Sequence, residues 1–186
     1  MGHMGDFWVF GYGSLIWNPG FAHVETARAR LSGYRRALCV RSWVHRGTQE
    51  RPGLVLGLDR GGSCLGLAFR VPGELRDEVL TYLRARELVT HVYVERELQA
   101  RLDDGRKINV VTYVCDRKHD QYAANIDADE AVEIISGASG KSGDNPSYVL
   151  STIEHLKALG IRDHWLEGVG ARLAGASALD RKTILS

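Results

Sequence analysis

The residues whose types and spacing could support chemistry begin with a glycine-containing stretch near the N-terminus, Gly11-Tyr12-Gly13-Ser14-Leu15. Glycine can adopt backbone conformations closed to other residues, which lets successive N–H groups converge on an anion or a carbonyl oxygen. Ser14 adds a hydroxyl that can donate or accept a hydrogen bond. The stretch is compatible with a ligand-binding loop, and equally with a glycine bulge in a buried strand that includes Trp8-Val9-Phe10.

Two glycine-rich segments invite comparison with phosphate-binding loops, and neither has the required pattern. A dinucleotide-binding fingerprint needs a third glycine where this chain has Ile16, and the following Asn18-Pro19-Gly20 is turn chemistry, not the start of a helix. The segment Gly137-Ala138-Ser139-Gly140-Lys141-Ser142-Gly143 resembles a P-loop, but Ile135 occupies the position of its first glycine. The sequence therefore predicts no nucleotide cofactor.

Glu87 is the side chain with the clearest potential for acid–base chemistry. It follows a predicted helix over residues 74–86 and falls about 20° from Leu80 on a helical wheel, at the edge of the apolar arc. A partly desolvated carboxylate has a raised pKa, which suits a general base. The alternative is an ion pair with Arg84 or Arg86 on a solvated face. The wheel alone favours that ion pair, because charged side chains are usually exposed.

The composition excludes several classes of function. The 24 Lys and Arg residues against 23 Asp and Glu residues give a net charge of +1, so no nucleic-acid or membrane partner is predicted. The seven histidines form no HExxH motif and no paired ligand spacing, so no metal site is predicted. Cys39, Cys64 and Cys115 contain no CxxC pair and indicate reduced thiols.

The chain carries no pattern typical of membrane insertion or export. No apolar run approaches the roughly 20 residues that a spanning helix needs, and no signal peptide is recognisable. We therefore expect a cytoplasmic protein. Residues 1–4 read as an expression-tag remnant with the natural start at Met4.

The elements that must position these residues are strands first and helices mostly later, which predicts an α+β fold. A hairpin is expected across Asp59 to Ser63, and a cap at Asn145 is expected to open a helix with Pro146 at its first position. We expect one domain over residues 5–175 and a C-terminal tail over 176–186. The expected strands include residues 28–31, 35–44, 54–58, 64–71, 92–102 and 107–115, with helices near 74–86 and after 127, 145 and 163.

Several motifs together resemble the ChaC-like γ-glutamylcyclotransferases, and the similarity extends over about residues 8–170. The resemblance implies a small closed β-barrel flanked by helices, and a lyase that cleaves glutathione into 5-oxoproline and cysteinylglycine without a cofactor or metal. The motifs are Phe10-Gly11-Tyr12-Gly13-Ser14-Leu15-Ile16-Trp17-Asn18-Pro19-Gly20-Phe21, Gly33-Tyr34-Arg35-Arg36, His45-Arg46-Gly47-Thr48, Pro52-Gly53-Leu54-Val55-Leu56-Gly57-Leu58, Gly61-Gly62-Ser63-Cys64-Leu65-Gly66, Arg86-Glu87 and Gly140-Lys141-Ser142-Gly143-Asp144-Asn145-Pro146-Ser147-Tyr148.

The resemblance also implies roles for individual residues. Glu87 matches the catalytic glutamate, which would act first as base on the substrate's α-amine and then as acid toward the leaving nitrogen. The loop that matches the γ-glutamyl-binding segment consists of Val9, Phe10, Gly11, Tyr12, Gly13, Ser14 and Leu15.

Two tyrosines and two arginines are further candidates for substrate binding. Tyr93 and Tyr148 match family tyrosines and could hydrogen-bond the substrate through their phenols, although each could equally be a core aromatic. Arg36 and Arg46 could bind a substrate carboxylate, or form ion pairs at the barrel rim. The sequence departs from many relatives at Val94-Glu95, where they have Arg-Pro. This departure leaves the local strand start and the substrate preference open.

Three functional hypotheses follow. The first is a glutathione-specific γ-glutamylcyclotransferase. The second is the same reaction on other γ-glutamyl amino acids or amines, and the third is a non-catalytic regulator of cation transport on the same fold. Glu87 beside an intact glycine loop favours an enzyme, because a binding module needs no positioned carboxylate. The sequence predicts no particular oligomeric state.

Overall fold

The computed structural model describes residues 5–184 and divides into two compact units, each built from two stretches of chain. The first unit contains the residues up to Ala37 together with Leu56–Tyr122. The second contains Leu38–Val55 together with the residues from Ala123 onward.

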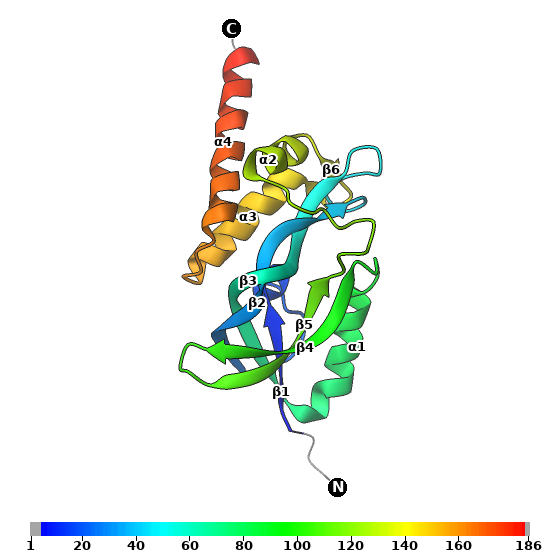
Figure 1. Cartoon of the computed structure of the whole chain (residues 1–186), viewed down its shortest axis with the longest axis vertical. Helices are drawn as coiled ribbons and strands as arrows, with labels where there is room; N and C mark the ends of the chain where they lie inside the picture. The colour runs from blue at the N-terminus through cyan, green and yellow to red at the C-terminus, as the bar shows by residue number, and fades with distance from the viewer. Residues whose placement is uncertain (1–4, 185–186) are drawn as a thin grey trace. The chain divides into compact units, whose positions relative to one another are not determined.

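The first unit holds most of a closed barrel (Figure 1). Its strands are β1 (Phe7–Gly11), β2 (Glu25–Ser42), β3 (Gly53–Val71), β4 (Tyr93–Leu102) and β5 (Lys107–Cys115), in the spatial order β1-β3-β2-β4-β5. Strand β1 pairs antiparallel with β3 and parallel with β5, which closes the barrel. All five residues of β1 are buried, as expected of a central apolar strand.

Helix α1 (Arg76–Glu87) follows a short 3₁₀ helix at Gly73–Leu75 and runs beside the barrel strands in Figure 1. Val79, Leu80 and Leu83 form its buried face. They pack in one apolar cluster with barrel residues that include Val9 and Tyr113. Burial of this stripe holds the C-terminal end of α1, and therefore Glu87, at the end of a rigid element.

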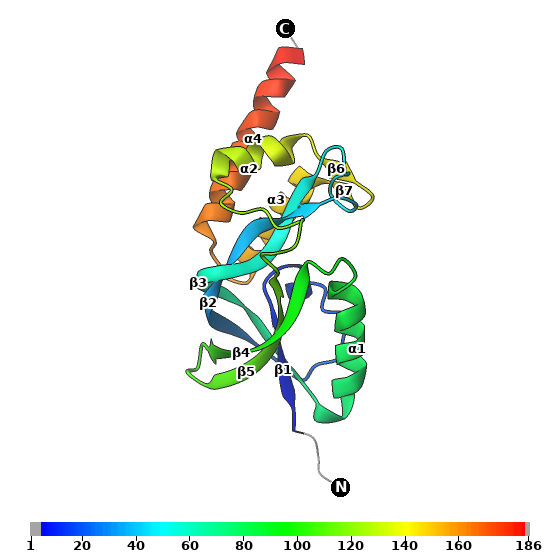
Figure 2. The same cartoon turned by 45° about the vertical axis from the view of Figure 1, so that its right-hand side comes forward.

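The second unit contains three helices, α2 (Ala128–Ser136), α3 (Asn145–Ala158) and α4 (His164–Ile184), which pack against one another (Figure 2). A small hairpin of β6 (Ser139–Gly140) and β7 (Gly143–Asp144) connects α2 to α3. The Asp127 carboxylate caps α2 by accepting the Glu130 N–H at 2.8 Å, as the capping-box spacing predicts.

The predicted cap of α3 was wrong by one residue. The Asp144 carboxylate caps this helix, accepting the Ser147 N–H at 2.8 Å, and Asn145 is already helical. The fully buried Asn145 amide instead binds the backbone of Leu54, accepting its N–H at 2.7 Å and donating to its carbonyl at 2.8 Å. Asn145 therefore joins α3 to the start of β3.

The predicted hairpin at Asp59 to Ser63 was also wrong, because β3 runs through it without a break. Gly61 and Gly62 have φ values of 102° and 67°, so they bend the strand in a conformation that other residues rarely adopt. The predicted break near Gly33 is likewise a point inside β2, where φ is 92°.

The predicted domain over 5–175 and the tail over 176–186 stay predictions. Helix α4 continues to Ile184, and residues 185–186 and the predicted tag remnant over 1–4 lie outside the described residues. Within residues 5–184, no helix is both long and apolar enough to cross a membrane.

Candidate functional site

The glycine-containing stretch forms a tight turn directly after β1. A short 3₁₀ helix at Ser14–Ile16 begins with the Ile16 N–H donating to the Gly13 carbonyl at 2.9 Å. A side chain at position 11 would place its Cβ 3.1 Å from the Leu15 Cβ, so the turn needs the small residue there. The first N–H groups of a helix have no acceptor within it, so those at Ser14 and Leu15 are candidate donors to a ligand.

Arg36 supports this loop from β2. Its side chain is only 9 % exposed, and its Nε donates to the Tyr12 carbonyl at 2.7 Å. Its Nη2 donates to the Leu65 carbonyl at the same distance. These two bonds fix the loop against β3, and the predicted role toward a substrate carboxylate stays a prediction.

Arg86 ties the loop to α1 from the other side. Its Nη2 donates to the Ser14 hydroxyl at 2.9 Å, and its Nη1 donates to the Asn18 carbonyl at 2.6 Å and to the Tyr82 hydroxyl at 3.1 Å. Sequence reasoning considered Arg86 only as an ion-pair partner of Glu87. Its position in the Arg86-Glu87 motif was the one available signal, and that signal does not reveal contacts to residues 68 or more positions away.

Gly20 lets the chain pass close to the same helix. Its φ is +73°, and a Cβ at this position would lie 2.0 Å from the Tyr82 hydroxyl oxygen. No side chain fits there without displacing Tyr82, so this glycine keeps the segment after the loop within reach of Arg86.

Glu87 is the last residue of α1, and its side chain is 17 % exposed. Burial raises the pKa of the Glu87 carboxyl, and the charge of Arg86 opposes this shift. The opposition is incomplete, because Arg86 Nε lies 3.6 Å from Glu87 Oε1, too far for a hydrogen bond. Both interpretations of the helical wheel thus hold in part: the carboxyl is desolvated and has a loose arginine neighbour.

Tyr93 begins β4 and packs against the apolar cluster that contains Val9, Leu15 and Leu83. Its hydroxyl donates to the Leu56 carbonyl at 2.7 Å. A Cβ at Gly13 would lie 3.6 Å from the Leu56 side chain, so Tyr93 reaches the β3 segment that borders the loop.

Glu95, part of the Val94-Glu95 pair that stands where many relatives have Arg-Pro, connects β4 to α1. The Glu95 carboxylate accepts two hydrogen bonds from Arg84 of α1, both at 3.0 Å, and one from the Tyr113 hydroxyl at 2.8 Å. The Arg84 guanidinium is the main cause of the lowered pKa of Glu95, with Tyr113 contributing. Glu95 therefore fastens β4 to α1, a connection that the residue types alone did not reveal.

Tyr148 and Arg46 belong to the second unit. The Arg46 guanidinium lies over the Tyr148 ring, 5.4 Å from its centre, and donates to the Asp144 carbonyl at 3.2 Å. These contacts describe a cation–π pair at the start of α3. The predicted substrate contacts of both residues stay predictions.

Comparison with known proteins decides the family. A family model described as "ChaC-like protein" matches residues 7–173. The chain belongs to the ChaC-like family.

ChaC-like relatives include the "Glutathione-specific gamma-glutamylcyclotransferase" of Escherichia coli, 39 % identical over 162 residues, covering 87 % of this chain and 70 % of that protein. The protein of the same name from Schizosaccharomyces pombe is 34 % identical over 174 residues, covering 83 % and 85 %. A crystal structure of a yeast γ-glutamyl cyclotransferase specific to glutathione has a TM-score of 0.82 at 22 % identity, covering 92 % of this chain and 96 % of that one.

The ChaC-like membership confirms the resemblance found in the sequence, and the yeast structure confirms the α+β fold with its closed barrel. In the first unit, the fold brings together the loop, Arg36, Tyr93 and Glu87, through contacts to α1, β2 and β3.

Proposed function

We propose that this chain is a glutathione-specific γ-glutamylcyclotransferase, a lyase that releases 5-oxoproline and cysteinylglycine. The observation that carries the proposal is Glu87, a desolvated carboxyl whose helix end is tied by Arg86 to the glycine loop. The names of the E. coli and S. pombe relatives support the same substrate.

The proposed reaction needs one carboxyl that changes protonation state. The α-amine of the substrate attacks its own γ-carbonyl carbon, forming the lactam C–N bond, and the amide bond to the cysteine nitrogen breaks. Glu87 takes the proton that the attacking amine loses and then gives it to the leaving nitrogen. A raised pKa suits this exchange, because the carboxyl must both accept and release a proton near neutral pH.

The loop serves the reaction by shape and by hydrogen bonding. Since the nucleophile belongs to the substrate, the enzyme's main task is to hold the γ-glutamyl group folded for attack. The N–H groups at Ser14 and Leu15 are the proposed donors to the oxygen that becomes negatively charged in the tetrahedral intermediate. Arg36 holds this loop by its bond to the Tyr12 carbonyl.

Two tyrosines complete the proposal. Tyr93 or Tyr148 hydrogen-bonds the amine or a carboxylate of the substrate through its phenol. A cytoplasmic location is part of the proposal, since Cys39, Cys64 and Cys115 are thiols and not disulfide-bonded, as expected in a reducing compartment.

The test is 5-oxoproline release from glutathione by the wild-type chain and by Glu87→Gln. The substitution keeps the size of the side chain and removes the base, so turnover should fall by at least about a hundredfold. Glu78→Gln is the matched control, because Glu78 is an exposed carboxylate of the same helix. It should leave turnover unchanged.

Each other outcome changes the assignment. Turnover retained by Glu87→Gln would remove Glu87 from the chemistry and keep the enzyme. Release from γ-glutamyl-alanine without release from glutathione would identify a different γ-glutamyl substrate. No release from either compound would favour the non-catalytic regulator.

A further inference from the structure

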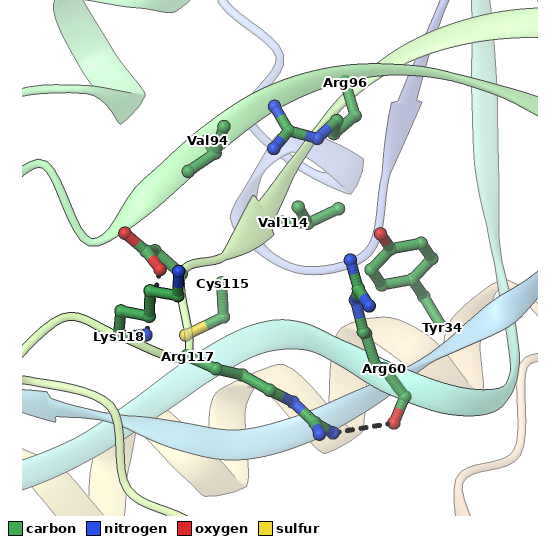
Figure 3. A pocket seen from close by; sticks show the side chains of 9 residues that line it. Tyr34, Arg60, Val94, Arg96, Val114, Cys115, Arg117 and Lys118 are labelled. Atoms are coloured by element: carbon green, nitrogen blue, oxygen red, sulfur yellow. Dashed lines mark hydrogen bonds between the residues drawn. The ribbon is translucent and has the colours of Figure 1, made fainter.

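A hollow of about 440 Å³ lies on the first unit (Figure 3). Neither Glu87 nor any residue of the glycine loop lines it. Its walls come from β2, β3, β4 and the segment at and after the end of β5: Tyr34, Arg60, Val94, Arg96, Val114, Cys115, Asp116, Arg117 and Lys118.

The hollow and the proposed active site use opposite faces of β4. Tyr93 and Glu95 face α1, because Tyr93 packs in the cluster under that helix and Glu95 binds Arg84. Successive side chains of a strand point to opposite faces, so Val94 and Arg96 point the other way. Val94 lies opposite Val114 in the pairing of β4 with β5, and the two valines form an apolar wall of the hollow.

Positive charge dominates the lining, with four cationic side chains against one carboxylate, that of Asp116. Arg117 is engaged outside the hollow, since its Nε donates to the buried Asp59 carboxylate at 2.8 Å. Among residues 5–184, the Arg96 guanidinium donates to the Glu95 carbonyl alone, at 3.0 Å. In the described part of the chain, neither Arg60 nor Lys118 has a side-chain ion pair with a carboxylate within 4.0 Å.

The backbone around Arg60 is held firmly although its guanidinium is not. The Arg60 N–H donates to Asp59 at 2.9 Å, and the Arg60 carbonyl accepts from Arg35 at 2.7 Å and from Arg117 at 3.1 Å. Figure 3 shows the side chains of Arg60 and Arg96 entering the hollow from two different strands, with Val114 between them in the view. Since the backbone is already fixed, binding an anion orders only the side chain of Arg60.

We propose that this hollow binds a small organic anion with two or more negative charges. Arg60, Arg96 and Lys118 pair with the anionic groups, because guanidinium and ammonium groups bind both carboxylates and phosphates. Val94, Val114 and the Tyr34 ring contact the carbon skeleton. The volume falls within the range of about 300–1,000 Å³ that is common for small-molecule sites.

The test is calorimetric titration of the full chain at low ionic strength, about 0.02 M, with phenyl phosphate, phthalate and inorganic phosphate. We expect a Kd below about 1 mM for at least one of the two organic probes. The tighter organic probe identifies the preferred anionic group, phosphate or carboxylate. Inorganic phosphate should bind more weakly, because it makes no contact with the apolar wall.

The variant is the double substitution Arg60→Gln with Arg96→Gln, which should weaken binding at least tenfold. The control is Arg101→Gln. Arg101 is exposed and belongs to β4, as Arg96 does, but it does not line the hollow. It should bind like the wild-type chain. If the double variant fails to fold by circular dichroism, Arg60→Gln alone replaces it, because the Arg60 side chain forms no ion pair with any carboxylate of residues 5–184.

Three results would overturn the proposal. They are no binding of either organic probe by the wild-type chain, equal weakening in Arg101→Gln, or equal affinity for inorganic phosphate and both organic probes. The titration does not use glutathione or turnover, so its outcome is independent of the proposed enzymatic function.

Discussion

Glu87 at the end of α1 and Glu95 on β4 have similar neighbours and opposite electrostatics. Glu87 is the last residue of α1 and Glu95 lies beside that helix, and both have an arginine of α1 nearby. The pKa of Glu87 is raised, mainly by burial, whereas the pKa of Glu95 is lowered, mainly by the hydrogen bonds from Arg84. A nearby arginine therefore does not decide the protonation of a glutamate.

The difference lies in what each arginine binds. Arg84 donates two N–H groups to Glu95, so the cost of burying the carboxylate is offset. Arg86 donates instead to Ser14, Asn18 and Tyr82, and its Nε remains 3.6 Å from Glu87. The contacts that fasten the glycine loop thus occupy the Arg86 guanidinium, which does not hydrogen-bond the Glu87 carboxylate, and the pKa of Glu87 stays raised by burial.

Giving both glutamates the same substitution is the strongest way to break this comparison. Glu87→Gln should lower kcat at least about a hundredfold, the scale of a lost general base, while Glu95→Gln should leave kcat within a few-fold of wild type. Steady-state release of 5-oxoproline measures both. Equal losses in the two variants would show that the contrast in pKa does not separate the chemical carboxyl from the structural one.

Changing the two arginines sharpens the comparison. Arg86→Ala should lower kcat/KM about tenfold, because the loop loses its tie to α1 and the substrate is held less well. It should also move the acidic limb of the kcat/KM profile to higher pH, since the removed cation was lowering the pKa of Glu87. Arg84→Ala should change neither quantity appreciably.

A lysine at position 86 separates the two effects of Arg86. Arg86→Lys keeps the positive charge, so the acidic limb of the kcat/KM pH profile should return toward its wild-type position. A lysine ammonium, however, lacks the two guanidinium NH₂ groups that bind Ser14 and Asn18 at the same time. The loss in kcat/KM should therefore persist in part. An acidic limb that is unchanged in Arg86→Ala would contradict the electrostatic coupling.

The fold was predictable where a local pattern determines it. The apolar stripe of α1, the buried run of β1 and the cap of α2 were all evident from residue types. The hairpin at Asp59 to Ser63 was not, because a glycine pair is equally compatible with a turn and with a bend inside a long strand. Whether the glycine pair forms a turn or a bend depends on pairing with strands that are distant in the sequence, and a local sequence pattern contains no information about that pairing.

The candidate site could be proposed from residue types, but its connections could not. Glycine spacing and helical phase are local properties, yet the wheel alone favoured an exposed ion pair for Glu87, and the family resemblance assigned the loop and Glu87 their proposed roles. The bond from Arg36 to the Tyr12 carbonyl and that from Arg86 to Ser14 join residues 24 and 72 positions apart. Arginine is compatible with many partners, so its type does not predict which it binds.

The two glutamates should also have opposite effects on stability at neutral pH. A folded-state pKa raised above the unfolded value means that ionising Glu87 costs folding free energy, and this cost grows as pH rises through that window. Glu87→Gln should therefore be at least as stable as wild type at pH 7. Glu95→Gln should be less stable by about 1 kcal/mol, because the lowered pKa reports stabilising partners.

Urea unfolding at pH 7 and at pH 3 measures both differences. The Glu95 contribution is present above the unfolded pKa and is lost as pH falls through the folded value, so the deficit of Glu95→Gln should shrink in acid. The advantage of Glu87→Gln should shrink as well, since both forms are then neutral. Stability changes of the same sign at pH 7 would contradict the assigned environments.

Tyr113→Phe has the smallest expected effect on stability, and it tests whether a side chain that interacts with both glutamates serves one of them or both. The buried Tyr113 hydroxyl donates to Glu95, and the charge of Glu87 also contributes to the raised pKa of the Tyr113 phenol. Removing the hydroxyl leaves Glu95 with its two bonds from Arg84, so stability at pH 7 should fall by about 0.5 kcal/mol, the low end for one hydrogen bond. This deficit should decline in acid, as Glu95 is protonated.

If Tyr113 serves only Glu95, Tyr113→Phe should leave kcat and the acidic limb of the pH profile as in the wild-type chain. A loss of turnover without a comparable loss of stability would instead place the phenol in the chemistry beside Glu87. Tyr113 would then contribute to both glutamates, and the structural role of Glu95 could not be separated from the chemical role of Glu87.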